Sequence, residues 1–404
     1  MDTAYFPVTE DRPVTPSGHV FGNDRPWKPI ANESMYDRIS RVADICQSPG
    51  VRDFYAKVPV IQSRRFYLER TQVCMCTVPK AASTSVKRLL LMAENPEKAE
   101  HYRSMPGNLV HAQAPLYETD SCSDKPGFSF FVARNPYERL YSAYIDKVFL
   151  EKFDSLSVLL DMVFTKKLSK QLVPMTSSNV IAFAKSMGYF CEVSNTSFEH
   201  FLSYVARART LDPHYTPASL MCNPCDQPVN HIFKQENLVN ESRSLVSYLN
   251  ESLQYNESYK NITLGLSDYA GDGGIENLVL TYANVWKTRL VRNQCKITST
   301  LYHAIWQRLW EGLKILGNIY DGAEYMPEIF EGKGIIFKSS STILKHFKRA
   351  SDALAVTSME ERERQRHRYL VEAYSRVSKP VLDSIRQLFQ LDFDMFGYDP
   401  NPPA

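Results

Sequence analysis

The sequence predicts an α/β fold in which a parallel sheet is flanked by helices and interrupted by helical insertions. The main observation is a pattern that occurs twice: an apolar run of strand length, then a polar loop, then an amphipathic helix. A second observation is that much of the remaining chain has apolar residues at helical spacing. Ligand-binding loops of such a sheet are expected at the ends of its strands.

The first of the two segments begins at residue 73. The run Val73–Val78 has the length of a buried strand and is followed at once by Pro79 and a polar turn. A helix is expected from Ser83 to Ala93, because its apolar residues fall on one face. This segment therefore predicts one strand–loop–helix unit.

The second segment repeats the pattern. The strand is expected over Phe128–Ala133, and a helix is expected from Tyr137 past Val148. Asn135 is a good cap for this helix, and Pro136 suits its first turn. Two units of this kind indicate parallel strands joined by helices.

The remaining chain is assigned more coarsely. Residues 1–35 are expected to be a tail or linker, and residues 36–400 a single domain. Residues 236–300 are interpreted as an insertion or long loop, with a surface insertion at 240–275. The charged run 360–368 is interpreted as a solvated helix face. Further helices are expected at 35–45, through most of 150–235, at 301–319 and over 358–391.

The charge balance limits the classes of partner. The chain has 404 residues, with 47 Lys and Arg against 45 Asp and Glu, for a formal net charge of +2 at pH 7. This balance argues against a general nucleic-acid binder but allows a local basic pocket for an anionic ligand. No run approaches the ~18 apolar residues of a membrane-spanning helix, and the first residues show no signal-peptide pattern.

Glycosylation motifs bear on the compartment. Asn-x-Ser/Thr occurs more often than the roughly two or three times expected by chance. The acceptor residues are Asn32, Asn195, Asn240, Asn250, Asn256 and Asn261. Four of them cluster in a polar stretch that suits a surface loop. This enrichment indicates a glycoprotein of the secretory lumen, which conflicts with the missing signal pattern. Either an upstream anchor segment is missing from this chain, which is the preferred interpretation, or the motifs are fortuitous.

The loop after the first strand has the composition of an anion-binding site. A helix N-terminus offers free backbone N–H groups and the positive end of the helix dipole. Ala81 and Ala82 let a phosphate approach the backbone, while Lys80 and Lys87 supply charge. Hydroxyl donors come from Ser83, Thr84 and Ser85. Because the G-x-x-x-x-G-K-[ST] motif and an acidic partner for Mg²⁺ are missing, a phosphate-like group bound without metal is expected.

The loop after the second strand predicts another anion contact. Arg134 stands at the end of the strand, and Ser142 lies two turns into the following helix. A guanidinium group suits phosphate because its fork is planar, bidentate and always charged. Two such loops on one sheet predict a ligand with two separate phosphate groups.

At this point the sequence resembles the Golgi carbohydrate sulfotransferases of the chondroitin and dermatan type, a membrane-bound family that uses 3′-phosphoadenosine 5′-phosphosulfate (PAPS). Val78–Arg88 is similar to the 5′-phosphosulfate loop of the family, and Phe131–Lys147 to its 3′-phosphate motif. Residues 212–238 are similar to a third motif, and Leu391–Tyr398 to the C-terminal one. The four matches occur in the family's order.

The resemblance implies the sulfotransferase fold with its P-loop-like sheet, PAPS as co-substrate, no metal, and a glycan acceptor, with glycosaminoglycans among the candidates. It also implies a Golgi location and an N-terminal membrane anchor, which this sequence does not show. The cofactor-binding residues that it implies are Pro79, Lys80, Ala81, Ala82, Ser83, Thr84, Ser85, Lys87, Arg134, Arg139 and Ser142. Val86, Asn135 and Tyr215 depart from the family's usual residues, which leaves acceptor specificity open.

The expected chemistry assigns catalytic roles. Sulfuryl transfer resembles phosphoryl transfer, with in-line attack and charge developing on the leaving group, which Lys80 is expected to stabilise. The acceptor hydroxyl needs a base. His111, between the two loops, is the first candidate, and His214 in the third motif is the second. Glu118 and Glu236 are the carboxylate alternatives.

Two short motifs have competing interpretations. Cys222-x-x-Cys225 has no second pair at zinc spacing, so a disulfide, within the pair or with distant cysteines, is preferred to a zinc site. Asp392-x-Asp394 resembles the metal motif of glycosyltransferases, but it lies in an apolar helix-like segment, so no metal role is expected.

The sequence therefore predicts a PAPS-dependent carbohydrate O-sulfotransferase. One alternative is a catalytically inactive glycan- or nucleotide-binding relative of the same fold, against which the presence of Lys80, Arg134 and Ser142 argues. The other alternative is a metal-free nucleotide-binding enzyme such as a kinase.

Overall fold

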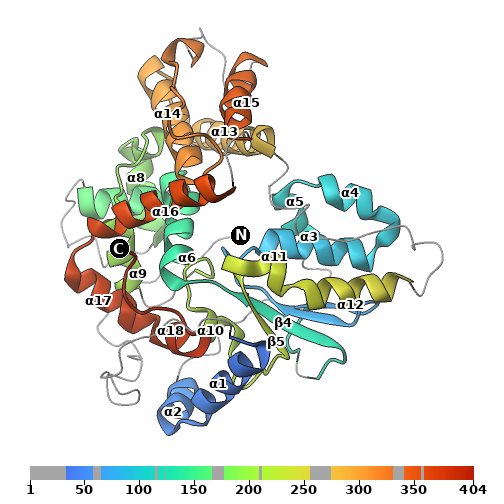
Figure 1. Ribbon diagram of the computed structural model, residues 1–404. Helices are drawn as coiled ribbons and strands as arrows, with labels where there is room; N and C mark the ends of the chain where they lie inside the picture. Colours follow the sequence, from blue (N-terminus) through green and yellow to red (C-terminus); the bar gives the residue numbers. More distant parts are fainter. Residues whose placement is uncertain are drawn as a thin grey trace.

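A mixed five-stranded sheet of order β3-β1-β2-β4-β5 forms the centre of the computed structural model (Figure 1). The described residues are 33–57, 65–113, 117–122, 124–165, 177–208, 212–254, 274–330, 341–355 and 359–404. The strands are β1 (Arg65–Leu68), β2 (Val73–Cys76), β3 (Glu118–Thr119), β4 (Phe128–Ala133) and β5 (His231–Lys234). The strands β2, β4 and β5 are parallel, and β1 pairs antiparallel with β2 and β3. The predicted α/β fold is confirmed, with an antiparallel edge added.

The two predicted strands, β2 and β4, lie next to each other in the middle of the sheet. All residues of β2 are buried, and Ser129 is the one residue of β4 that is not. Apolar runs buried on both faces are typical of parallel strands covered by helices. Cys76 pairs with Phe131, so the loops that follow β2 and β4 leave the same edge of the sheet close together.

Helices cover both faces of the sheet and form a third group apart from it. Figure 1 shows α3 (Ser83–Glu94) and α12 (Arg243–Gln254) on one side, and α1 (Met35–Gln47), α10 (Ala218–Cys222) and α18 (Gln390–Phe396) on the other. The third group, at the top of the picture, contains α13 (Gly274–Arg292), α14 (Ser299–Ile315) and α15 (Ser341–Ala355). None of the helices in the described ranges is long and apolar enough to cross a bilayer.

The other helical elements connect these groups. Early in the chain they are α2 (Pro49–Lys57), η1 (Pro96–Lys98), α4 (Ala99–Ser104) and α5 (Gly107–Gln113). After β4 they are α6 (Pro136–Ala143), η3 (Tyr144–Phe149), α7 (Asp154–Leu160), η4 (Asp161–Thr165), α8 (Ser177–Ser186), η6 (Tyr189–Cys191) and α9 (Phe198–Arg207). After β5 they are η7 (Gln235–Asn237), α11 (Leu238–Glu241), η10 (Pro327–Phe330), α16 (Met359–Ser375) and α17 (Lys379–Leu388).

The predicted helices are present with small shifts at their ends. Asn135 caps α6 as expected, since its side chain accepts a hydrogen bond of 2.9 Å from the backbone N–H of Tyr137. The expected helix over 358–391 is instead divided into α16, α17 and the start of α18. Pro380 in the first turn of α17 explains one break, because proline begins a helix easily but interrupts one that is already formed.

The predicted surface insertion is helical in the part that the structure describes. The helix α12 buries Leu245, Leu249 and Leu253, spaced four residues apart, and it contacts α3. The helix α13 also lies within the 236–300 stretch that was expected to be an insertion or loop. The spacing of these leucines is that of an amphipathic helix, but the glycosylation motifs in the same polar stretch favoured the interpretation as a loop. Residues 255–273, which contain two of the glycosylation motifs, lie outside the described residues.

Four disulfides join distant parts of the chain: Cys46–Cys225, Cys74–Cys122, Cys76–Cys222 and Cys191–Cys295. The prediction that the Cys222-x-x-Cys225 motif forms disulfides is confirmed, and both partners are distant cysteines. With both sulfur atoms used in this way, the motif is not half of a zinc site. Two of the four bonds begin in β2, where Cys74 and Cys76 link the strand to Cys122 and Cys222.

A buried ion pair fixes α13 to the segment that follows η3. Glu151 and Arg289 are both almost completely buried, and their side chains form a salt bridge. The second carboxylate oxygen of Glu151 accepts a hydrogen bond of 2.8 Å from the backbone N–H of Ser194. Arg289 also donates to the carbonyl oxygens of Phe190 and Glu192, at 2.8 and 2.7 Å. The pair is therefore fully hydrogen-bonded.

Removing one member of this pair is expected to be strongly destabilising. Glu151→Ala leaves the buried Arg289 charge without its counter-ion, which costs about 3–5 kcal/mol. The measurement is the free energy of unfolding from urea titration. Arg292→Ala is the matched control, because Arg292 lies on the same helix, is half exposed and pairs with Asp154. That surface pair contributes about 0–1 kcal/mol, so equal losses in the two variants would contradict the assignment.

Candidate active site

The loop between β2 and α3 has a backbone conformation suited to binding an anion. Lys80 and Ala82 have left-handed backbone conformations, with φ of 67° and 54°. This conformation costs energy in residues other than glycine and persists where the surrounding structure enforces it. The helix α3 begins after Ala82 with no capping side chain. The side chain of Ala82 therefore caps none of the backbone N–H groups of the first turn, and this turn has the position of a helix N-terminal anion site.

Arg139 is hydrogen-bonded to the backbone of this loop. Its Nε donates to the carbonyl oxygen of Pro79 at 2.9 Å, and its two terminal nitrogens donate to the carbonyls of Thr216 and Pro213 at 2.5 and 2.9 Å. Burial lowers the pKa of Arg139 to about 10. Because the guanidinium group is buried and bonded to the backbone, Arg139 joins the first loop to the third motif as a positioning residue. The contact of Arg139 with the cofactor stays a prediction.

Arg134 stands at the end of β4, as expected, and the protein uses only part of its guanidinium group. One terminal nitrogen donates to the carbonyl of Lys80 at 2.9 Å, and the other lies 3.4 Å from Glu138. Its Nε is buried and has no hydrogen-bond partner. Burial, together with repulsion from Arg134, lowers the pKa of Arg366 on α16. Two guanidinium groups near an unused donor make this a suitable place for an anion.

Three lysines converge on a single carboxylate beside the loop; we call these four residues the lysine cluster. The Nζ atoms of Lys80 and Lys147 lie 3.0 and 3.2 Å from Oδ2 of Asp146, and Nζ of Lys152 lies 2.6 Å from Oδ1. Burial opposes ionisation of Asp146, but the three ammonium groups outweigh it and hold the pKa of Asp146 well below its ordinary value. Three positive charges against one negative charge leave the cluster positive.

A change of helix type after β4 determines where the side chains of the lysine cluster point. Asp146 and Lys147 lie in η3, a π-helical turn that continues α6 without a break. Turns of this kind are rare and often occur at functional sites, because the extra residue redirects the side chains that follow it.

His214 lies beside the lysine cluster and is paired with a carboxylate. Its Nδ1 is 2.5 Å from Oδ1 of Asp212, and its ring packs edge-on against Phe153. The ammonium group of Lys147 lies over the same Phe153 ring. Burial and the neighbouring Lys147 lower the pKa of His214, although Asp212 acts in the opposite direction. The neutral ring donates from Nδ1 to Asp212, which leaves the lone pair on Nε2.

His111 reaches the same loop from the other side. The helix α5 places its Nε2 2.9 Å from Oγ1 of Thr84, in the first turn of α3. The structure therefore brings both histidine candidates to the predicted loop. In His111 the hydroxyl of Thr84 contacts Nε2. In His214 the carboxylate of Asp212 contacts Nδ1 rather than Nε2.

Glu118 and Glu236, the carboxylate alternatives for the base, lie elsewhere in the fold than the two histidines. Glu118 lies in β3, two strands away from β2 in the sheet. Glu236 accepts a hydrogen bond from the backbone N–H of Asn135 at 2.7 Å and another from the hydroxyl of Tyr398 at 2.9 Å. Glu236 thus connects the loop after β4 to the C-terminal motif.

The remaining predicted residues differ in position. Lys87 is buried, with its ammonium group 5.8 Å from the centre of the Phe66 ring, because it lies on the face of α3 that packs on the sheet. Its contact with the cofactor stays a prediction. Ser83 is buried at the start of α3, and Ser85 and Ser142 are half-buried in α3 and α6.

The C-terminal motif has a structural role in this region. Asp392 is buried and accepts hydrogen bonds of 2.8 Å from the backbone N–H groups of Ala218 and Ser219, which caps α10 and holds the third motif. Asp394 accepts hydrogen bonds from the side-chain amide of Gln390. Across the described ranges, no group of three or more His, Cys, Asp or Glu side chains is arranged to hold a metal.

Five residues of the site were not predicted: Asp146, Lys147, Lys152, Asp212 and Arg366. Asp212 precedes His214 by two residues, a spacing that a short Asx turn would have suggested. Asp146 lies inside a segment already recognised as a motif. Arg366 gave no signal, because it is one of many charged residues in a run that resembles an ordinary solvated helix.

Comparison with known proteins places these motifs in a family. A model described as "Sulfotransferase family" matches residues 64–272. Carbohydrate sulfotransferase 11 of Rattus norvegicus is 26% identical over 229 residues, covering 53% of this chain and 61% of the relative. Carbohydrate sulfotransferase 9 of Homo sapiens is 25% identical, covering 50% of this chain and 44% of the relative. Carbohydrate sulfotransferase 10 of Homo sapiens is 26% identical, covering 31% and 38%.

The chain thus spans about three fifths or less of the length of these relatives. No solved structure gives a significant match. The matched residues include both loops, the lysine cluster and both histidine candidates.

Proposed function

The chain belongs to the sulfotransferase family, and from this premise we propose that it transfers a sulfuryl group from PAPS to a hydroxyl group of a glycan. The observation that carries the proposal is the positively charged lysine cluster beside the uncapped start of α3. Arg134, with its unpaired buried donor, supplies a second anion-binding place on the next strand. A ligand with phosphate groups at two positions fits this arrangement.

The two places suit the two ends of PAPS. We assign the 5′-phosphosulfate to Lys80 and the first turn of α3, and the 3′-phosphate to Arg134, Ser142 and Arg366. Bound PAPS supplies an activated sulfuryl group with a phosphate as its leaving group. Lys80 and its neighbours stabilise the negative charge that develops on that phosphate, while Asp146 holds their ammonium groups together.

We assign the role of base to His214. Its Nε2 accepts the proton of the acceptor hydroxyl while the acceptor oxygen forms its bond to sulfur and the bond from sulfur to the leaving phosphate breaks. Asp212 fixes the ring and stabilises the imidazolium that forms. The negative charge on the phosphate and the positive charge on His214 appear together, so the atoms and charges balance.

Arg134→Ala is expected to weaken binding of the product 3′-phosphoadenosine 5′-phosphate (PAP) about 10- to 150-fold. The change removes a charge-assisted contact worth roughly 1.5–3 kcal/mol. Isothermal titration calorimetry gives the dissociation constant. Arg376→Ala is the control, because Arg376 is an exposed arginine directly after the end of α16. An Arg134→Ala affinity equal to that of wild type would remove the 3′-phosphate assignment.

The proposed reaction is tested directly with ³⁵S-labelled PAPS and a panel of acceptors: chondroitin, dermatan, heparan and their desulfated forms. Transfer of label supports the proposal. PAP binding without transfer to any acceptor would favour the inactive binding relative. Transfer of a phosphoryl group from ATP, without transfer of a sulfuryl group from PAPS, would favour a kinase.

The compartment that we propose is the Golgi lumen. All eight cysteines are paired, and disulfides of this kind form and persist in oxidising compartments. The family resemblance points to the same place.

A further inference from the structure

The C-terminal segment of the chain is connected to the loop that follows β4. Gly397, which follows the last helix α18, has a left-handed backbone conformation with φ of 63° and ends that helix. The hydroxyl of the next residue, Tyr398, donates at 2.9 Å to one carboxylate oxygen of Glu236 in η7. The other oxygen of Glu236 accepts at 2.7 Å from the backbone N–H of Asn135. One carboxylate therefore joins the C-terminal segment to the residue that directly follows Arg134.

Tyr398 is held in a fixed position by its surroundings. Its side chain is buried, and the ammonium group of Lys234 lies 4.9 Å from the centre of its ring. Its backbone N–H donates to the carbonyl oxygen of Phe393 at 3.0 Å. Burial and the nearby carboxylate of Glu236 raise the pKa of Tyr398 well above its ordinary value, so the hydroxyl keeps its proton. Tyr398 is thus a fixed hydrogen-bond donor for Glu236.

The same segment contacts the start of α6 a second time. The hydroxyl of Tyr137, in the first turn of α6, donates to the carbonyl oxygen of Pro400 at 2.7 Å. The ring of Tyr137 packs against Phe393, with centroids 5.2 Å apart. The backbone N–H of Tyr137 donates in turn to the side chain of Asn135. Both the backbone N–H and the side-chain oxygen of Asn135 are therefore engaged.

These contacts determine where Arg134 lies. One of its terminal nitrogens donates to the carbonyl oxygen of Lys80 at 2.9 Å, so its side chain reaches the loop after β2. The backbone before Arg134 is held in β4, which pairs with both β2 and β5, and the backbone after it is held at Asn135. The contact of a guanidinium group with phosphate is directional, because the planar fork must match the phosphate oxygens. A shift of the backbone at Asn135 therefore changes the contact that Arg134 can make.

We propose that Tyr398 is a positioning residue for recognition of the 3′-phosphate. It acts through Glu236, which holds the backbone at Asn135 and so directs Arg134. The inference rests on the proposed function and deepens it. It names a residue that determines how strongly the chain distinguishes PAPS from adenosine 5′-phosphosulfate, the same donor without the 3′-phosphate. Tyr398 lies beyond residue 272, where the family match ends.

The test compares two ligands that differ only in the 3′-phosphate, PAP and adenosine 5′-monophosphate (AMP). Calorimetry with the whole chain gives both affinities, and their ratio reports the contribution of the 3′-phosphate. Tyr398→Phe removes only the hydroxyl and keeps the ring beside Lys234. We expect it to weaken PAP binding about 3- to 10-fold, the scale of one hydrogen bond, and to leave AMP binding at the wild-type value.

Changes at Glu236 test whether the effect passes through this carboxylate. Glu236→Ala removes both contacts and should weaken PAP binding at least as much as Tyr398→Phe. Glu236→Gln is the conservative variant, because its amide oxygen can accept from Asn135 and its amide nitrogen can donate to the hydroxyl of Tyr398. It should stay within about 2-fold of wild type. The double variant of Tyr398→Phe and Glu236→Ala should lose no more than Glu236→Ala alone, since residues of one hydrogen-bond network do not act additively.

Hydrogen exchange follows the same contact without any ligand. The backbone N–H of Asn135 is protected by Glu236, so the peptide that contains it should exchange faster in Tyr398→Phe and in Glu236→Ala. Mass spectrometry gives the exchange rate. Unchanged exchange of this peptide in both variants would overturn the inference.

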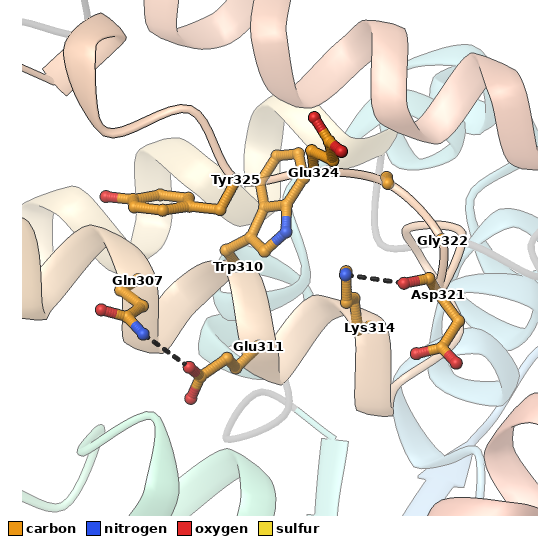
Figure 2. Close-up of a pocket in the computed structure, with 9 residues that line it drawn as sticks. Gln307, Trp310, Glu311, Lys314, Asp321, Gly322, Glu324 and Tyr325 are labelled. Carbon is orange, nitrogen blue, oxygen red and sulfur yellow. Dashed lines mark hydrogen bonds between the residues drawn. The ribbon is translucent and has the colours of Figure 1, made fainter.

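Two tyrosines of the helical group at the top of Figure 1 provide matched controls. Tyr282 in α13 is buried, and its hydroxyl donates to the carbonyl oxygen of Ile305 at 3.1 Å. Tyr325 lines a cavity of about 450 Å³ beside α14, and Figure 2 shows it next to Trp310. Tyr282→Phe and Tyr325→Phe each remove one hydroxyl, and both should keep the wild-type ratio of PAP to AMP affinity. Tyr282→Phe also shows how far the loss of a buried hydrogen bond lowers the melting temperature by itself.

The outcomes separate the inference from the proposed function. A wild-type ratio of PAP to AMP affinity in both Tyr398→Phe and Glu236→Ala would overturn the inference and leave the proposed function in place. An equal loss of PAP and AMP binding in these variants would also overturn it, because such a loss indicates general damage to the site. A wild type that binds PAP no more tightly than AMP, and transfers no label from PAPS, would overturn the proposed function and the inference with it.

Discussion

His214→Ala is expected to reduce turnover about 10²- to 10⁴-fold, the usual scale for loss of a general base, while PAP affinity stays nearly unchanged. The expectation follows from the pairing of His214 with Asp212, 2.5 Å away, which leaves Nε2 as the proton acceptor beside the lysine cluster. Initial rates with saturating PAPS give turnover, and calorimetry gives PAP affinity. Asp212→Asn should produce a smaller loss, because the ring remains but loses its orienting charge.

His111→Ala is the matched control for the base. The Nε2 of His111 is engaged by Thr84 at 2.9 Å, so its loss should perturb the loop and affect PAPS binding more than the chemical step. If His111→Ala abolishes turnover while His214→Ala is active, the base is His111. If both variants remain active, the base is a carboxylate, and Glu236 and Glu118 are the next to test.

The pH dependence follows from the same geometry. The base must be neutral, so kcat/KM falls when the pH drops through the pKa of His214 in the free enzyme. Burial lowers this pKa from the ordinary value of about 6.5. The fall in kcat/KM on the acidic side should therefore lie below pH ~6.5. The residual activity of His214→Ala should not show this fall.

Lys80→Ala is the second large effect, with turnover expected to fall about 10²- to 10³-fold and PAPS binding to weaken. The variant loses the contact between Lys80 and Asp146. It also loses the positive charge that Lys80 places beside the leaving phosphate. The left-handed backbone at this position suits alanine no worse than lysine, so the loss reports the charge. Single-turnover rates separate the chemical step from binding.

Lys379→Ala is the comparison for this variant, since Lys379 is an exposed lysine whose partner is also exposed. It should retain wild-type turnover. Wild-type turnover in Lys80→Ala would show that the leaving phosphate is stabilised elsewhere, and Lys147 and Lys152 would be the next to change.

The sequence predicted those strands and helices whose formation depends on residues close together in the chain. The strands β2 and β4 were predictable because they are continuous apolar runs that end in sharp polar loops. The strand β5 was not, since a four-residue run of His231–Lys234 has no usable period and its assignment depends on pairing with β4. The same holds for β1, whose role is defined by its antiparallel neighbours.

The candidate site was predictable to a similar degree. Lys80, Arg134, His111 and His214 were identified from loop chemistry and from the resemblance, and the structure places them at or beside one loop. What local patterns cannot give is the partner of each charge. Asp146 and Arg366 enter only because segments far apart in the sequence meet in three dimensions.

The π-helical turn η3 makes the site sensitive to a one-residue change in chain length. A π turn is equivalent to an α-helix with one inserted residue, and each residue of an α-helix rotates the following side chains by about 100°. Deleting one residue between Tyr144 and Asp146 would restore the regular helix and turn the carboxylate away from Lys80. The same rotation would carry Phe149 away from Arg308. The extra residue of η3 therefore sets the direction of both the Asp146 carboxylate and the Phe149 ring, so a one-residue deletion there is expected to disturb the lysine cluster and the contact with α14 together.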